Sequence, residues 1–164
     1  MRPLIAIAVS AMAVGLSVAQ TPEEMLGPVD LSTPESAVYS LMRGMYQGDA
    51  EMIDEVMLED GVFRRVLGDG GVSPDGLANW REWVSTLEVG SAHEDLFAVQ
   101  SEQFGNMATV WAPFVIRVDG EIVNCGVNTM TLAQTEHGWK IVFGMDTPAP
   151  IETCDTFKAE YSAK

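Results

Sequence analysis

Two asparagines in the last third of the chain, Asn124 and Asn128, are the polar residues whose spacing most clearly indicates a site. They lie in a stretch with the alternating pattern of a strand, where side chains four residues apart share a face with apolar neighbours. A buried amide needs hydrogen-bond partners, so the pair predicts an internal polar network, ordered water or a bound ligand. A structural pair and a ligand-recognition pair fit the sequence equally well.

Aromatic residues form the second candidate group, because their rings line ligand cavities as well as protein cores. Tyr39, Trp80 and Trp111 are candidates for the mouth of a cavity, although core filling is the more common role of any single ring. The candidate ligand-binding residues are therefore Tyr39, Trp80, Trp111, Asn124 and Asn128.

Groups that transfer protons, attack substrates or hold metals are harder to place in this sequence. An amide does not titrate near neutral pH, so asparagine positions a ligand but cannot act as a general acid or base. His93 and His137 are far apart in the sequence and lack the spacing of a metal site. The sequence contains no Gly-x-Ser-x-Gly motif, and neither cysteine has a histidine that suits catalysis. We therefore predict no catalytic residue, no metal and no cofactor.

Arg64 and Arg65 are adjacent on a predicted strand, so one of them is expected to face inward. An inward guanidinium would attract an anionic ligand. This is the one feature of the sequence that opposes a neutral ligand.

The composition limits the class of protein and of partner. The 164 residues include 24 Asp and Glu against 9 Lys and Arg, a formal net charge of −15, and 47% of them are hydrophobic. This length and apolar fraction predict one soluble globular domain. A surface this acidic repels phosphate groups and anionic headgroups, so we expect no nucleic-acid partner and no membrane partner.

The first 19 residues have the pattern of a signal peptide. Arg2 precedes an apolar run over residues 4–16, and Ser17 and Ala19 supply the small residues that a signal peptidase recognises. The run is shorter than the roughly 20 residues of a membrane-spanning helix. We predict cleavage after Ala19, export to the periplasm or out of the cell, and no membrane attachment of the mature chain.

Export bears on the two cysteines, Cys125 and Cys154, because an oxidising compartment allows them to form a disulfide. We predict that bond. The alternative is two unpaired thiols, with Cys125 buried on a strand.

Helical periodicity predicts three helices before a sheet. The first begins at a capping box made by Ser32 and Glu35 and ends at Gly48. Asp49 begins the second helix, and Ser73 caps the third. Strands are predicted over 62–67, 94–100, 106–118, 121–134 and 139–147, and short turns between the last three make the sheet antiparallel.

Strand alternation assigns two rows of side chains to the face that the helices cover. Residues 20–31 lack periodicity and are predicted to be a flexible arm before a domain of residues 32–148, which a C-terminal tail of residues 149–164 follows. The two rows are Ile122, Asn124, Gly126, Asn128, Met130 and Leu132 on one strand, and Trp139, Ile141, Phe143 and Met145 on the next.

Four short motifs in order carry a family resemblance: residues 108–114 (ATVWAPF), 118–120 (VDG), 125–128 (CGVN) and 138–141 (GWKI). With the helix order, they make the chain resemble the nuclear transport factor 2-like superfamily, in the branch known as SnoaL-like or lumazine-binding. The resemblance implies an α+β fold in which a cone-shaped, curved antiparallel sheet is covered by three N-terminal helices. It also implies a cavity between them, which some members use for isomerase or dehydratase chemistry and others only for binding or dimerisation.

The chain departs from this branch at the positions where ionisable groups are frequent. Members often carry His before the Cys-Gly pair, Asp three residues after that Cys, and Glu after the aromatic residue that follows Ala-Pro. This chain has Asn124, Asn128 and Val115 there. Each departure removes a group that could transfer a proton.

The sequence therefore favours an exported protein that binds a small, mostly apolar molecule in its cavity without turning it over. A dehydratase or isomerase is the first alternative, and it requires an ionisable group in the cavity that the sequence does not place. A dimeric interaction module without a ligand is the second, and it makes a homodimer a further expected partner. The ligand itself is not predicted.

Overall fold

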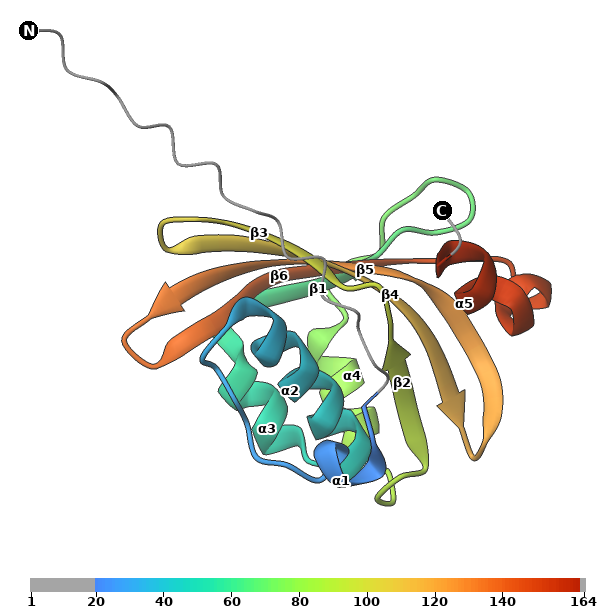
Figure 1. The fold of residues 1–164 in the computed structure, drawn as a ribbon, viewed down its shortest axis with the longest axis horizontal. Coiled ribbons are helices and arrows are strands. Elements are labelled where there is room, and N and C mark those ends of the chain that lie inside the picture. The colour runs from blue at the N-terminus through green and yellow to red at the C-terminus, as the bar shows by residue number, and fades with distance from the viewer. Residues whose placement is uncertain (1–19, 163–164) are drawn as a thin grey trace, which may run out of the picture.

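The computed structural model describes residues 20–162, which form a curved sheet with helices on both faces (Figure 1). The strand order is β1-β6-β5-β4-β2, with β3 paired to β4 beside β2, and every pairing is antiparallel except the parallel pair β1 and β6. The helices are α1 (Pro22–Met25), α2 (Pro34–Gln47), α3 (Ala50–Val56), α4 (Leu77–Val84), η1 (Ile151–Thr153) and α5 (Cys154–Ser162). The strands are β1 (Met57–Arg65), β2 (Ala92–Leu96), β3 (Gln100–Phe104), β4 (Met107–Val118), β5 (Glu121–Thr135) and β6 (Gly138–Pro148).

Local chemistry fixes the ends of the first two long helices. Thr33 caps α2 in a capping box with Ser36, one residue later than the predicted pair of Ser32 and Glu35. The helix ends at Gly48, as predicted, because the backbone there has φ +66° and an added Cβ would lie 2.4 Å from a carbonyl oxygen. The Asp49 carboxylate then accepts two backbone hydrogen bonds and begins α3, as predicted.

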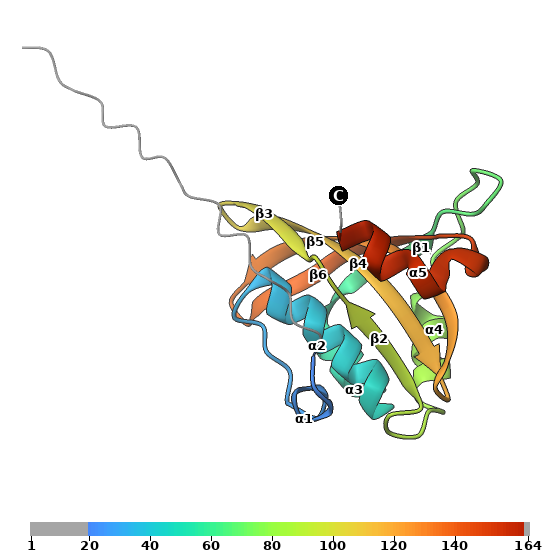
Figure 2. The ribbon, with the colours of Figure 1, turned by 45° about the vertical axis from the view of Figure 1, so that its right-hand side comes forward.

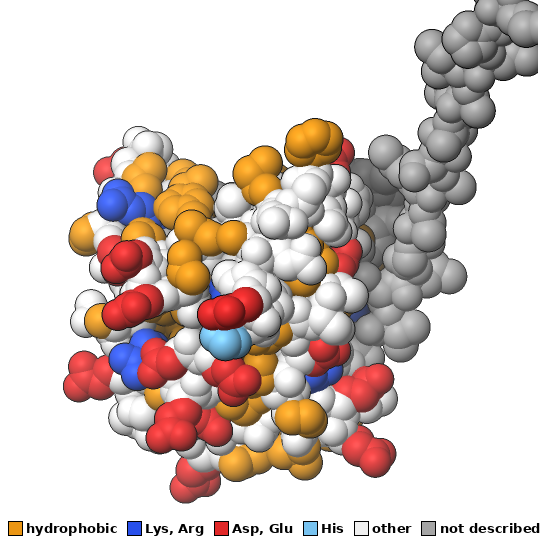
Figure 3. Space-filling view, turned by 90° about the vertical axis from the view of Figure 1, so that its left-hand side faces the viewer, with side chains coloured by type: hydrophobic (Ala, Val, Ile, Leu, Met, Phe, Trp, Pro, Cys, Tyr) orange, Lys and Arg blue, Asp and Glu red, His pale blue; other side chains and the backbone are white. Residues whose placement is uncertain are grey.

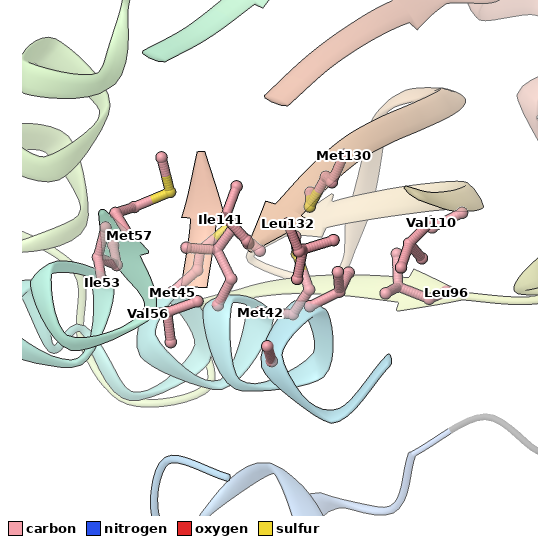
Figure 4. Close-up of a cluster of buried hydrophobic side chains, with 14 of the residues drawn as sticks. Met42, Met45, Ile53, Val56, Met57, Leu96, Val110, Met130, Leu132 and Ile141 are labelled. Atoms are coloured by element: carbon pink, nitrogen blue, oxygen red, sulfur yellow. The ribbon is translucent and has the colours of Figure 1, made fainter. Parts of the chain in front are cut away.

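The core lies between these helices and one face of the sheet, called here the inner face (Figure 4). Met42 and Met45 of α2 and Ile53 of α3 are buried against this face. Burying each such side chain contributes about 1.5 to 3 kcal/mol, so this contact is the main attachment of the helices. Their partners on the strands include Leu96, Val110, Met130, Leu132 and Ile141.

Residues 20–31, predicted to be a flexible arm, instead pack on the domain. Met25 of α1 is fully buried, and the Gln47 side-chain amide donates to the carbonyl oxygens of Met25 and Gly27. The Asp30 amide donates to the Ser40 hydroxyl, which donates back to the Asp30 carbonyl oxygen. The segment lacks periodicity because it is short, but its backbone groups find partners on α2.

Two β-bulges change which side chains face inward. Leu132 pairs with Ile141 but Thr131 pairs with Phe143, so one extra residue lies between them on β6. The alternation beyond that point is reversed, and Gly144 and Asp146 face inward instead of Phe143 and Met145. The predicted inward placement of Phe143 and Met145 is therefore wrong.

A second bulge lies between β4 and β5. Ile116 pairs with Asn124 but Arg117 pairs with Ile122, so Val123 is the extra residue. Ile122 consequently packs with Cys125 on the outer face, not with the helices as predicted. From Asn124 to Leu132 the predicted alternation holds.

The C-terminal helix α5 covers part of the outer face of the sheet (Figure 2). Cys125 of β5 and Cys154 of α5 form the predicted disulfide, with Cα atoms 5.5 Å apart. Lys158 forms an ion pair of 2.7 Å with Asp95 of β2, and the Tyr161 hydroxyl accepts a hydrogen bond from the Trp111 indole. Helix α5 therefore contacts strands β5, β4 and β2 on the outer face of the sheet.

No helix within residues 20–162 is both long and apolar enough to cross a membrane. The predicted signal peptide, residues 1–19, lies outside the described residues.

We expect reduction of the Cys125–Cys154 disulfide to lower the free energy of unfolding by about 3 to 4 kcal/mol, because it closes a loop of 29 residues in the unfolded chain. Urea unfolding with and without a phosphine reductant measures the loss. A C125A/C154A variant is the matched control, and the reductant should not change its stability. A wild-type midpoint insensitive to the reductant would contradict the bond.

Candidate functional site

A cavity of about 210 Å³ lies between the inner face of the sheet and helices α2 and α4. Its deep wall is formed by buried residues such as Met42, Phe114 and Asn128, and its rim by Arg64, Arg65 and Ser73, which are more exposed. The volume is below the roughly 300 Å³ at which typical ligand pockets begin, so it suits a small molecule. The remaining lining residues are Phe63, Gly76, Trp80, Glu94, Ile116, Asn124 and Asp146.

Glu94 is an ionisable group inside this cavity. On β2, Ala92, Glu94 and Leu96 share the inner face, and the Glu94 carboxylate accepts a hydrogen bond of 2.6 Å from the Asn128 side-chain amide. The pKa of Glu94 is raised to about 7, mainly by burial and also by the charge of Asp146, while the Asn128 hydrogen bond and the charge of Arg65 oppose the increase. Near neutral pH the carboxyl group can therefore both accept and donate a proton.

Asp146 is a second carboxyl group in the cavity, and Arg65 neutralises it. These residues are register partners in the parallel β1–β6 pair, and the Arg65 Nε lies 3.0 and 2.9 Å from the two carboxylate oxygens. The Asp146 side chain is 6% exposed and that of Arg65 is 49% exposed, so the pair runs from the interior to the rim. The hydrogen bond to Asp146 raises the pKa of Arg65. A buried carboxylate is tolerated when it is paired in this way.

The two predicted asparagines both line the cavity, but they have different partners. Asn128 is 3% exposed, and its side-chain NH₂ donates a hydrogen bond to Glu94. The side-chain oxygen of Asn124 accepts a hydrogen bond of 2.9 Å from the backbone amide of Cys125. The Asn124 side-chain NH₂ makes no hydrogen bond to the described residues, so it is the donor that can reach a ligand.

The aromatic candidates are not brought together. Trp80 lines the cavity and stacks on Phe63 at 6.0 Å between ring centroids. Tyr39 packs against the core and is not a lining residue. Trp111 lies on the outer face, because Val110 and Ala112 beside it point inward, so its predicted place at the cavity is corrected.

Sequence reasoning missed Glu94, Asp146 and the role of Arg65. Glu94 had a usable signal, since Ala92 and Leu96 flank it at strand spacing and mark that face as inward. Asp146 had no such signal, because its orientation depends on the bulge after Ile141.

The prediction that Ser73 caps the third helix is wrong. The Ser73 hydroxyl instead accepts a hydrogen bond from the backbone amide of Arg65. The helix α4 begins at Leu77, whose backbone amide donates a hydrogen bond to the Asp75 carboxylate.

No three His, Cys, Asp or Glu residues within 20–162 are placed to hold a metal ion together. The chemistry that the described side chains offer is proton transfer by Glu94, with amide and guanidinium donors and apolar side chains around it.

Comparisons with known proteins establish the fold. No protein-family model matches the chain, and no curated protein matches it. A protein of unknown function from Shewanella baltica, described as nuclear transport factor 2-like, has a TM-score of 0.57 at 12% identity, covering 71% of this chain and 90% of its own. This chain has the nuclear transport factor 2-like fold. The predicted fold class is confirmed, and the SnoaL-like branch stays a prediction.

Two further structures with this fold bear on function only through their descriptions. A proposed dehydratase of the nuclear transport factor 2-like family from Streptomyces avermitilis has a TM-score of 0.57 at 21% identity, covering 72% of this chain and 99% of its own. A nuclear transport factor 2-like protein from Novosphingobium aromaticivorans has a TM-score of 0.55 at 20% identity, covering 68% and 77%. Such similarity shows the fold alone, so function must be argued from the side chains.

We expect Glu94→Gln to stabilise the protein above neutral pH. The folded pKa of about 7 exceeds the ordinary value of 4.5, so the folded state holds the extra proton and wild-type stability falls as pH rises between those values. The variant lacks this loss and should be more stable by about 3 kcal/mol at pH 8, with no difference near pH 4. Urea unfolding at both pH values checks this, with the exposed Glu59→Gln as control. Equal pH dependence in all three proteins would contradict the buried carboxyl group.

Proposed function

We propose that this protein is a proton-transfer enzyme of the isomerase or dehydratase class, acting on a small molecule in its cavity. The observation that carries the proposal is Glu94, a carboxyl group with a pKa raised to about 7, which faces an apolar cavity and is oriented by Asn128. A general acid or base is most effective when its pKa lies near the working pH. This is the group that the first alternative from the sequence required.

The neighbouring residues suit the steps of such a reaction. Above neutral pH, Glu94 is a carboxylate that removes a proton from a substrate carbon, and it then returns that proton to another atom of the same molecule. Asn124 offers its side-chain NH₂ to an oxygen on which negative charge develops. Asp146 accepts the Arg65 hydrogen bonds and so holds that guanidinium in the wall of the cavity.

Binding without turnover remains a second candidate, because the same cavity has apolar walls and few polar groups. The two candidates differ at Glu94 alone. A binder would keep its affinity for a ligand when Glu94 is replaced, whereas an enzyme loses its rate.

Export, a homodimer and the absence of nucleic-acid and membrane partners are further parts of this proposal. The disulfide between Cys125 and Cys154 supports export to an oxidising compartment. Phe104, Met107 and Trp111 expose apolar surface on or beside the outer face, which supports a homodimer through the sheet. The net charge of −15 supports the expectation that neither a nucleic acid nor a membrane is a partner.

The isomerisation of cyclohex-3-enone to cyclohex-2-enone is the test, since it moves one proton from the α carbon to the γ carbon and needs no other reactant. We expect the protein to accelerate it over buffer, with a kcat/KM that rises with pH and is half-maximal near pH 7. Glu94→Gln should lower kcat/KM about 100-fold or more, and the exposed Glu59→Gln should not. A rate equal to that in buffer, or an unchanged rate in Glu94→Gln, would refute the catalytic role.

A further inference from the structure

The charged residues that line the cavity leave one negative charge unpaired when Glu94 is ionised. Arg65 faces inward, but Asp146 holds its guanidinium and the two charges cancel. Arg64 also borders the cavity, but it is the register partner of the outward-facing Met145, so it lies on the outer face of the sheet. Within residues 20–162, Glu94 forms no ion pair.

One oxygen of the Glu94 carboxylate is available to a ligand. Its Oε1 accepts the 2.6 Å hydrogen bond from Asn128, and its Oε2 accepts none from the part of the chain that the structure describes. A carboxylate oxygen in a partly buried position gains most from a charged donor. A ligand with a positive charge and N–H groups would satisfy this oxygen and compensate the charge of Glu94 together.

The other lining residues indicate which kind of cation fits. A calcium or magnesium ion needs several oxygen ligands, and no three acidic, His or Cys residues within 20–162 are placed to hold one together. An organic ammonium ion can bind a single carboxylate through its N–H groups. The stacked rings of Phe63 and Trp80, together with Phe114, offer apolar surface to the rest of such a molecule.

The charge of the whole protein has the same sign as the unpaired charge in the cavity. The chain has a net charge of −15, and Figure 3 shows acidic side chains gathered over the lower part of one face. A small cation is attracted to such a protein and a small anion is repelled. Arg65 does not reverse this preference in the cavity, because Asp146 takes its hydrogen bonds.

We infer that the substrate is a small organic cation, whose protonated nitrogen pairs with Glu94 while its apolar body lies against Phe63, Trp80 and Phe114. This names the substrate class of the same site and rests on the proposed function. The positive charge of the substrate would also stabilise the negative charge that develops on a neighbouring carbon as Glu94 removes a proton. A cationic group is thereby added to the mostly apolar ligand that the sequence favours.

The test compares benzylamine, which is protonated at pH 8, with benzyl alcohol, a neutral probe of the same shape. Chemical-shift titrations of the wild-type protein at pH 8 should show benzylamine binding about 10-fold more tightly or better. Glu94→Gln should lower the affinity for benzylamine to that for benzyl alcohol. Glu59→Gln is the matched control, because Glu59 is exposed on β1, does not line the cavity and removes the same charge; the preference should persist in it.

The pH dependence of binding to the wild-type protein is a second measurement. Because the pKa of Glu94 is about 7, the affinity for benzylamine should rise about 10-fold from pH 6 to pH 8, and that for benzyl alcohol should change little. The charged groups that act on Glu94 are Arg65 of β1 and Asp146 of β6, which pair with each other. Helices α2 and α4 present the uncharged Met42 and Trp80 to the cavity.

Four results would overturn the inference: benzyl alcohol binding as tightly as benzylamine, a preference that survives in Glu94→Gln, a preference lost in Glu59→Gln, or binding of neither probe. The cyclohexenone assay uses a neutral probe and does not depend on this preference. A preference for benzylamine without cyclohexenone turnover would therefore refute the proposed proton transfer alone. Turnover without the preference would refute the cationic substrate alone.

Discussion

The ion pair between Arg65 and Asp146 is the interaction on which the site depends. It joins β1 to β6 at the end of their parallel pairing and places a neutralised carboxylate in the wall of the cavity. Because Asp146 has its own partner, a second carboxyl group, that of Glu94, can lie partly buried in the same cavity with only an amide as its hydrogen-bond partner. Burial raises the pKa of Glu94, so that its protonated and ionised forms are both populated near neutral pH. The same shift lowers the free energy of unfolding as pH rises toward 7.

The curved sheet separates two functions by the alternation of its strands. On β5, Asn124 points into the cavity, and the next residue, Cys125, points outward into the disulfide that holds α5. On β2, Glu94 points inward and Asp95 outward to Lys158. β5 and β2, two of the strands that carry polar groups into the cavity, are therefore held from outside by one helix, and the contacts of the cavity and of the helix share a backbone without sharing a face.

The parts of the fold that depend on local chemistry were predictable from the sequence. The stop at Gly48 and the turn at Asp119-Gly120, where φ is +51° and +85°, follow from residues that accept those backbone angles. The orientation of Asp146 was not predictable, because a bulge adds one residue to β6 without a sequence signal. Every side chain of β6 after that bulge faces the side of the sheet opposite to the one predicted by simple alternation. Asn124 and Asn128 were placed correctly because no bulge lies between them, whereas Glu94 was overlooked despite a readable pattern.

The central claim is that Glu94 titrates near neutral pH inside the cavity. The most direct measurement is a ¹³C NMR titration of its side-chain carboxyl carbon, assigned by the signal that disappears in Glu94→Gln. The account predicts a pKa of about 7, since burial outweighs the Asn128 hydrogen bond. A value near the ordinary 4.5 would show that water reaches the group freely and would remove the basis for proton transfer in this cavity.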